Sequence, residues 1–324
     1  MVFFYFPDKR MRIYLKHLTV FLFGCFATFF VGYKLGNRRQ LCEIDRNRVY
    51  TSPNYKNLDK STHFGKLESK FRCHVGKLKL LIVSTSNVSS FDRRRAIRET
   101  WGRGHYKKGD TRTFFAVGKS YDRNTMKRLT AESHQHRDII KGDFFEKFYN
   151  LPYKFEMILE WAYKYCDFEY LLKTDDDVFV NLDNIYQLLD SQNIQHTRLY
   201  LGRAQYTSGV ARKGKYAATY EEYAKEMYPP FVGGGAVVFS RDVVESMVPF
   251  FHRPVYKLDD IYIAMLIANT GVPTTHNERF KYVKRMCHWD NDALTLHFLY
   301  RKNVSSCMQH LYYRLLSEKS VIRS

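Results

Sequence analysis

Residues 168–181 read FEYLLKTDDDVFVN, and this stretch decides the fold. The mostly apolar segment 168–174 leads directly into Asp175, Asp176 and Asp177, and the apolar run 178–180 follows. Short apolar runs bounded by polar residues are typical of buried parallel strands. In α/β sheets, ligands bind beyond the carboxyl ends of the strands. The sequence therefore predicts a strand that presents three carboxylates at a binding site.

The segments on either side alternate between two patterns. Short apolar runs predict strands, and apolar residues at helical spacing predict helices. The predicted strands are 78–85, 111–117 and 138–141, and the predicted helices are 126–136, 151–166 and 258–268. This alternation predicts an α/β fold with a mixed, mostly parallel central sheet flanked by helices.

The composition narrows the class of protein. The chain has 324 residues, of which 45% are hydrophobic, and a formal net charge of +19 from 52 basic and 33 acidic side chains. These values exclude a disordered tail, a collagen and a miniprotein built only on disulfides. The charge favours an anionic partner. No zinc-finger, helix-turn-helix or RNA-binding signature is present, so a nucleic-acid partner is not expected.

The N-terminal region contains an apolar segment at 17–33 without Lys, Arg, Asp or Glu. A buried soluble helix would show a polar face, and a cleaved signal peptide would end in a small-residue site. We therefore expect an uncleaved transmembrane signal-anchor, close to the lower limit of about 17 residues for a membrane span. It would follow a cytoplasmic tail (1–16) and precede a stem (34–75) and a folded body (76–324). Two NVS glycosylation sequons in the body favour the lumenal side.

The cysteines suggest two disulfides. Cys73 and Cys166 adjoin neighbouring elements and form one hypothetical pair, and Cys287 and Cys307 form another in the C-terminal segment. Cys25 lies in the apolar segment 17–33, and Cys42 in the stem is then the odd one left over. An odd cysteine in a secreted chain is a candidate for an intermolecular bridge, so a disulfide-linked dimer is one expectation.

The acidic residues are the first candidates for chemistry. Three adjacent carboxylates repel one another unless a cation lies among them. Because side chains alternate at a strand end, Asp175 and Asp177 can converge while Asp176 points elsewhere. Two hard oxygen ligands suit Mg²⁺ or Mn²⁺ bridging to phosphate oxygens, and a solvated acidic turn is the alternative. For the second acidic pair, Asp259 and Asp260, the alternative is the first turn of a helix.

Five blocks of sequence occur in a fixed order. They are RRAIRETWG (94–102), DF with NL and Lys154 (143–154), KTDDDVFVN (173–181), YPPF to Ser240 (228–240) and DDIYI (259–263). Together they resemble the signatures of the β-1,3-galactosyltransferase-like enzymes, glycosyltransferase family 31. The resemblance implies a GT-A fold for the folded body, a UDP-sugar donor, a divalent cation that is usually Mn²⁺, and transfer with inversion. It also implies a single-pass type II protein of the Golgi membrane with a lumenal catalytic domain.

The same resemblance assigns residues to roles. The metal ligands would be Asp177, assisted by Asp175, and His297, for which His288 and His310 are rivals. The residues expected to bind the nucleotide sugar are Arg94, Arg98, Lys154, Asp175, Asp176 and Gly234.

A general base is needed on the face opposite UDP. Asp260 is the expected base, with Asp259 as the alternative. The alternative for this arginine-rich segment is a solvated helix face, and Arg93 and Arg95 are interpreted in that way.

Some positions depart from the family pattern. Ala236 and Val237 stand where Gly and Tyr are usual, so the donor sugar is not fixed by the resemblance. The expected reaction is transfer of a hexose or N-acetylhexosamine, galactose first, in β-1,3 linkage to a glycan on a glycoprotein, glycolipid or glycosaminoglycan. The alternative is a catalytically silent lumenal relative that binds UDP or sugar, or a chaperone of another transferase.

Overall fold

The computed structural model describes most of the folded body. The described residues are 67–69, 73, 76–103, 110–251, 255–284, 287–299 and 302–322. The chain divides into two units, 1–49 and 50–324, and all described residues belong to the second. The expected cytoplasmic tail, the signal-anchor and Cys42 lie outside the described residues. Within the described part, no helix combines the length and the apolar character needed to cross a membrane.

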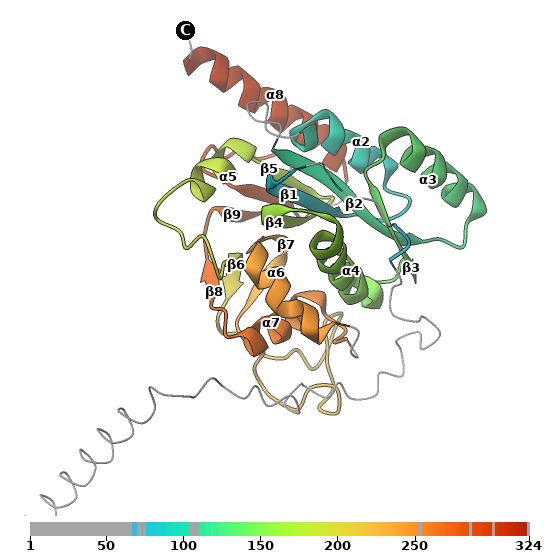
Figure 1. Ribbon diagram of the computed structural model, residues 1–324, viewed down its shortest axis with the longest axis vertical. Helices are drawn as coiled ribbons and strands as arrows, with labels where there is room; N and C mark the ends of the chain where they lie inside the picture. Colours follow the sequence, from blue (N-terminus) through green and yellow to red (C-terminus); the bar gives the residue numbers. More distant parts are fainter. Residues whose placement is uncertain are drawn as a thin grey trace, which may run out of the picture. The chain divides into compact units, whose positions relative to one another are not determined.

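A seven-stranded sheet lies at the centre of the body, in the order β3-β2-β1-β4-β7-β6-β8 (Figure 1). Its strands are β1 (Leu78–Thr85), β2 (Thr111–Lys119), β3 (Ile139–Phe145), β4 (Phe168–Asp175), β6 (Tyr200–Gln205), β7 (Phe231–Ser240) and β8 (Thr274–His276). The two pairings that involve β7 are antiparallel, and the other four are parallel. The prediction of a mixed, mostly parallel sheet is confirmed.

A second, three-stranded sheet has the order β5-β10-β9. Its strands are β5 (Val178–Val180), β9 (Phe280–Val283) and β10 (Thr295–Phe298). The sequence reasoning missed this sheet because its strands are short and far apart along the chain. It lets the C-terminal part of the chain pair directly with the segment that follows the aspartate triplet.

Two apolar cores cover the opposite faces of the large sheet, because side chains alternate along each strand. On β1, Leu81 and Val83 join the core completed by α4, α6 and α7, whereas Leu80 and Ile82 join the core completed by α2, α3, α5 and α8. The helices are α2 (Phe91–Glu99), α3 (Arg123–His136), α4 (Leu151–Tyr165), α5 (Leu182–Leu189), α6 (Arg241–Met247), α7 (Asp259–Thr270) and α8 (Val304–Ile322). This packing holds rigid the strand ends that carry the polar loops.

The predicted elements agree with the observed ones to within a few residues. Helix α4 ends at Tyr165, one residue before the predicted end, and α7 begins one residue after the predicted start. Helix α3 begins three residues earlier than predicted because Asp122 caps it, accepting hydrogen bonds from the backbone N–H groups of Asn124 and Thr125.

Both hypothetical disulfides are confirmed. Cys73 is bonded to Cys166, which joins the segment before β1 to the end of α4. Cys287 is bonded to Cys307, which joins the segment after β9 to α8. Along the chain, the first bond spans β1, β2 and β3, and the second spans β10.

Candidate active site

Three potential metal ligands meet at the carboxyl end of β4. Asp175, Asp177 and His297 each offer one ligand atom, and these atoms all lie within 4.8 Å of one another. Nε2 of His297 is 3.3 Å from Oδ1 of Asp177. Strand β10 brings the histidine here, because its antiparallel pairing with β5 sets His297 opposite Val178. The structure therefore brings together the three residues predicted as ligands, whereas the rival His288 and His310 are exposed and outside this group.

A buried lysine supports the first of these carboxylates. The ammonium group of Lys173 lies 2.8 Å from Oδ1 of Asp175 and donates a second hydrogen bond, of 2.7 Å, to the carbonyl oxygen of Gly234. Burial raises the pKa of Asp175, and the charge of Lys173 opposes this rise. Lys173 thus links the end of β4 to Gly234, the middle of three consecutive glycines in β7 (233–235, the glycine segment).

The middle aspartate points away from the metal-ligand group, as the alternation predicts. Asp176 accepts a 2.7 Å hydrogen bond from the hydroxyl of Ser86 and another of 2.7 Å from Arg93. The same guanidinium lies 3.4 Å from Asp177. Arg93 therefore contacts the turn formed by Asp175, Asp176 and Asp177, called the acidic turn below. Its interpretation as a solvated helix face is wrong.

Three consecutive glycines of β7 pass close to three polar side chains. A Cβ atom on Gly233, Gly234 or Gly235 would lie 2.2–2.3 Å from an atom of Tyr282, Asp260 or His297, respectively. Only residues without a side chain permit this approach. The register between β6 and β7 shifts at this segment, so the glycines form an irregularity in the sheet.

Asp260 lies at the start of α7 and faces the middle glycine. Its Oδ2 accepts a 2.9 Å hydrogen bond from the backbone N–H of Gly234. Burial, followed by the neighbouring carboxylate of Asp259, raises the pKa of Asp260 well above its ordinary value. Lys173 and the Gly234 N–H act in the opposite direction. A carboxylate in this setting is a stronger base than one in water.

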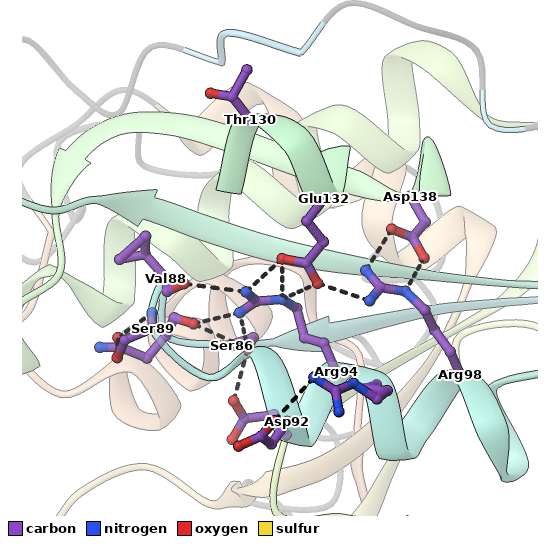
Figure 2. Close-up of polar contacts among 12 residues, drawn as sticks. Ser86, Val88, Ser89, Asp92, Arg94, Arg98, Thr130, Glu132 and Asp138 are labelled. Atoms are coloured by element: carbon purple, nitrogen blue, oxygen red, sulfur yellow. Dashed lines mark hydrogen bonds and ion pairs between the residues drawn. The ribbon is translucent and has the colours of Figure 1, made fainter. Parts of the chain in front are cut away.

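Two arginines of α2, Arg94 and Arg98, point toward Glu132 and Asp138 (Figure 2). Arg94 is completely buried and donates hydrogen bonds to the carboxylate of Glu132 and to the carbonyl oxygen of Asn87. Arg98 bridges Glu132 and Asp138. Burial alone would raise the pKa of Glu132, but Arg94 and then Arg98 outweigh it and hold the pKa below its ordinary value. Neither arginine lines the cleft, so their placement corrects the expectation that they touch the nucleotide sugar.

The loop after β1 is tied to the site through Ser86. The ammonium group of Lys154 donates to the carbonyl oxygen of Ser86 and to both carboxylate oxygens of Glu146, at 2.7–2.8 Å. The hydroxyl of Ser86 accepts from Arg94 and donates to Asp176. Lys154 and Arg94 therefore both bind Ser86, whose hydroxyl contacts Asp176.

These groups surround one cleft of about 1300 Å³. Its lining includes the three potential metal ligands together with Asp259 and Asp260. The volume exceeds the roughly 300–1,000 Å³ that is typical of a pocket for one small ligand. The cleft therefore has room for more than one small ligand.

A family model described as Galactosyltransferase matches residues 92–278. The match covers more than half of the chain and includes the aspartate triplet and Asp260. The chain belongs to the galactosyltransferase family. His297 lies beyond the end of the matched range, so the third potential ligand of this galactosyltransferase family member comes from outside it.

Relatives in the galactosyltransferase family share about a third of the residues. Beta-1,3-galactosyltransferase 5 of Mus musculus is 37% identical over 60% of this chain and 64% of its own length, and the human protein of that name is 32% identical over 60% and 64%. The chain thus matches slightly less than two thirds of the length of these relatives. Beta-1,3-galactosyltransferase 1 of Mus musculus is 31% identical over 75% of this chain and 76% of its own length.

Solved structures show a weaker likeness. The apo WbbM bifunctional glycosyltransferase has a TM-score of 0.40 at 8% identity, over 74% of this chain and 50% of that chain. The mannosyltransferase PcManGT from Pyrobaculum calidifontis, solved with GDP-Man and Mn²⁺, has a TM-score of 0.39 at 10% identity, over 80% and 68%. TM-scores below 0.5 do not by themselves establish a shared fold.

Two residues of the site escaped the sequence reasoning. No pattern separates Arg93 from the arginines that follow it, because the phase of α2 decides which one faces the cleft. Lys173 did carry a usable signal. It interrupts an apolar strand two residues before Asp175, and alternation places both side chains on one face.

Proposed function

We propose that this protein is a metal-dependent glycosyltransferase. It transfers a hexose or N-acetylhexosamine, with galactose as the first expectation, from a UDP-sugar to a glycan hydroxyl in β-1,3 linkage with inversion. The observation that carries the proposal is the convergence of Asp175, Asp177, His297 and Asp260 on one cleft. The names of the relatives, beta-1,3-galactosyltransferases 5 and 1, support the sugar and the linkage.

The donor set fits a divalent cation. Two carboxylates and one imidazole, with ligand atoms within 4.8 Å of one another, suit Mn²⁺ or a similar ion. Asp175, Asp177 and His297 would hold it. The bound ion would act as a Lewis acid that offsets the negative charge on the leaving diphosphate. Arg93, at the same turn, adds positive charge beside the place where the diphosphate would lie.

The chain's own base would complete the reaction. Inversion in one step needs a group that removes the proton from the acceptor hydroxyl as it attacks. We assign this step to Asp260, because burial makes its carboxylate more basic and the Gly234 N–H holds that carboxylate in place. Asp259, which also lines the cleft, is the alternative base.

The cellular setting is also a proposal. The charge-free apolar segment 17–33 and the NVS sequons support a single-pass type II protein of the Golgi membrane with a lumenal catalytic domain. The acceptor would then be a glycan on a glycoprotein, a glycolipid or a glycosaminoglycan. Cys42 in the stem would be available for a disulfide-linked dimer.

The test is an assay of UDP release. The full-length protein in detergent is incubated with Mn²⁺, one UDP-sugar at a time and a panel of neutral and anionic glycan acceptors. We expect release that requires the metal, one sugar and one class of acceptor, and that disappears in Asp177→Ala. Product linkage and anomeric configuration are then read by NMR. Binding of UDP with metal but no release from any donor would support the silent relative instead.

A further inference from the structure

Tyr282 lines the cleft but has no role in the reaction as proposed above. It lies on β9, and the parallel pairing of β9 with β10 sets it beside His297. The centroids of the two rings are 5.5 Å apart. The neighbours Phe280 and Val283 are buried, whereas Tyr282 is 38% exposed and lines the cleft. The strand therefore presents its tyrosine to the space beside the metal-ligand group.

The glycine segment of β7 fits this tyrosine as closely as it fits the other site residues. A Cβ atom on Gly233 would lie 2.2 Å from Oη of Tyr282 but 3.5 Å from Cζ. The next two glycines make the same close approach to Asp260 and His297. Two of these three side chains have assigned roles in the reaction. The third side chain, Tyr282, approaches the β7 backbone equally closely but has no assigned role.

The phenol of Tyr282 has a hydrogen to donate. Within the described part of the chain, its hydroxyl forms no hydrogen bond with any residue. A tyrosine hydroxyl has an ordinary pKa of about 10, so it is protonated at neutral pH. The guanidinium of Arg203 lies 5.3 Å from the centroid of its ring and restrains the ring by a cation–π contact. A restrained donor at the surface of a cleft is suited to bind an oxygen of a ligand.

We propose that Tyr282 contacts the transferred sugar and donates a hydrogen bond to one of its hydroxyl groups. The inference rests on the proposed function, because it uses the positions of the metal and the base. The diphosphate would lie at the metal beside His297, and the acceptor hydroxyl would lie at Asp260. The sugar must lie between these two places. Tyr282 is beside His297, and it contacts Gly233 just as Asp260 contacts the next residue, Gly234.

The first experiment compares binding of UDP with binding of the intact UDP-sugar. Both are titrated calorimetrically with Mn²⁺ and without acceptor, on the full-length protein and its Tyr282→Phe variant. We expect the variant to bind the UDP-sugar about fivefold more weakly and to bind UDP unchanged, since one neutral hydrogen bond is lost. Tyr313→Phe, a change on the exposed face of α8, is the matched control and should leave both affinities unchanged.

Donors that lack single hydroxyl groups identify the contact. Tyr282→Phe should lower kcat/KM about fivefold to tenfold for the parent donor, and much less for the deoxy donor that lacks the contacted group. A residue with only a structural role would lower kcat/KM equally for all donors.

The glycine offers an independent test of the same contact. Gly233→Ala should displace the phenol and reduce binding of the UDP-sugar, because its methyl group would overlap Oη. In the Tyr282→Phe background the same methyl group would meet only ring carbon at 3.5 Å, so Gly233→Ala should add little.

Equal affinities of wild type and Tyr282→Phe for the UDP-sugar would overturn the inference, and so would an equal loss for UDP and the UDP-sugar. These outcomes differ from failure of the proposed function, which would show as no turnover of any donor by the wild-type protein.

Discussion

Replacing Gly234 by alanine would place a methyl group 2.2 Å from Oδ1 of Asp260 and 3.0 Å from its Cγ. Ordinary contacts of a Cβ atom begin at 3.4 Å, so the carboxylate must move by about 1 Å. The carboxylate of Asp260 is the end of a short flexible side chain, so it can move without unfolding the sheet. A displacement of about 1 Å in a catalytic group costs roughly 100-fold in rate, or about 2.7 kcal/mol of transition-state stabilisation.

We therefore expect Gly234→Ala to lower kcat about 100-fold while binding of UDP with Mn²⁺ stays within about twofold. The neighbouring change Gly235→Ala is the matched comparison, because its methyl group would lie 2.3 Å from Nδ1 of His297 instead. It should weaken metal-dependent UDP binding. Both variants are assayed by UDP release, by calorimetric titration of UDP, and by thermal unfolding to show that the fold is intact.

Two results would refute this reasoning. If Gly234→Ala keeps more than about a third of the wild-type kcat, Asp260 either tolerates the displacement or is not the base. If Gly234→Ala and Gly235→Ala lose UDP binding equally, the glycine segment acts as one unit, and the separation into a base contact and a metal contact is wrong.

Further predictions concern the acidic groups. Asp177→Ala should abolish metal-dependent UDP binding in a titration, whereas Asp260→Asn should bind UDP and lose transfer; substantial turnover by Asp260→Asn would contradict its assignment as the base. Because burial and Asp259 raise the pKa of Asp260, its basic form is lost as the pH falls through that raised pKa, so kcat/KM should decline well above the pH of about 4 at which an exposed aspartate titrates. A profile that stays flat down to that pH would contradict the pKa shift. Glu132→Gln should destabilise the protein by about 3 kcal/mol in urea unfolding, because it breaks a buried pairing with Arg94. The folded-state pKa of Glu132 is lowered, so this stabilisation is present above the unfolded-state pKa and is lost as the pH falls through the folded-state pKa. The difference between wild type and variant should therefore shrink in acid, and a difference that does not change with pH would argue against the ion pair.

Strands β6, β7 and β8 of the large sheet were not predicted, because β8 has no apolar residue and glycines interrupt β6 and β7. Strands β1 to β4 could be predicted from local pattern because each contains a short apolar stretch. The run 168–174 is one example, and α4 follows in the same way from apolar residues at helical spacing. The three-stranded sheet could not be predicted in this way. Its strands β5, β9 and β10 have three or four residues each, and their pairing depends on the tertiary fold.

The residues of the candidate site also fall into those that a local rule predicts and those that depend on tertiary packing. Asp175 and Asp177 could be predicted as a pair because alternation along a strand is a local rule. The direction of an arginine on α2 depends on which face of the helix packs on the sheet. That packing buries Arg94 beside Glu132, a partner 38 residues away, and turns Arg93 to the acidic turn. Sequence pattern alone could not distinguish these two neighbours.

The pairing of β5 with β10 makes completion of the site depend on the order in which the chain is synthesised. Asp177 is made well before His297, which belongs to the last tenth of the chain. A nascent chain that has reached the end of α7 already holds both aspartate ligands and Asp260, but it lacks the histidine. Under the proposed function, a polypeptide that stops before β10 would lack the third of the proposed metal ligands. The proposed metal site would therefore be complete only once β10 has been made.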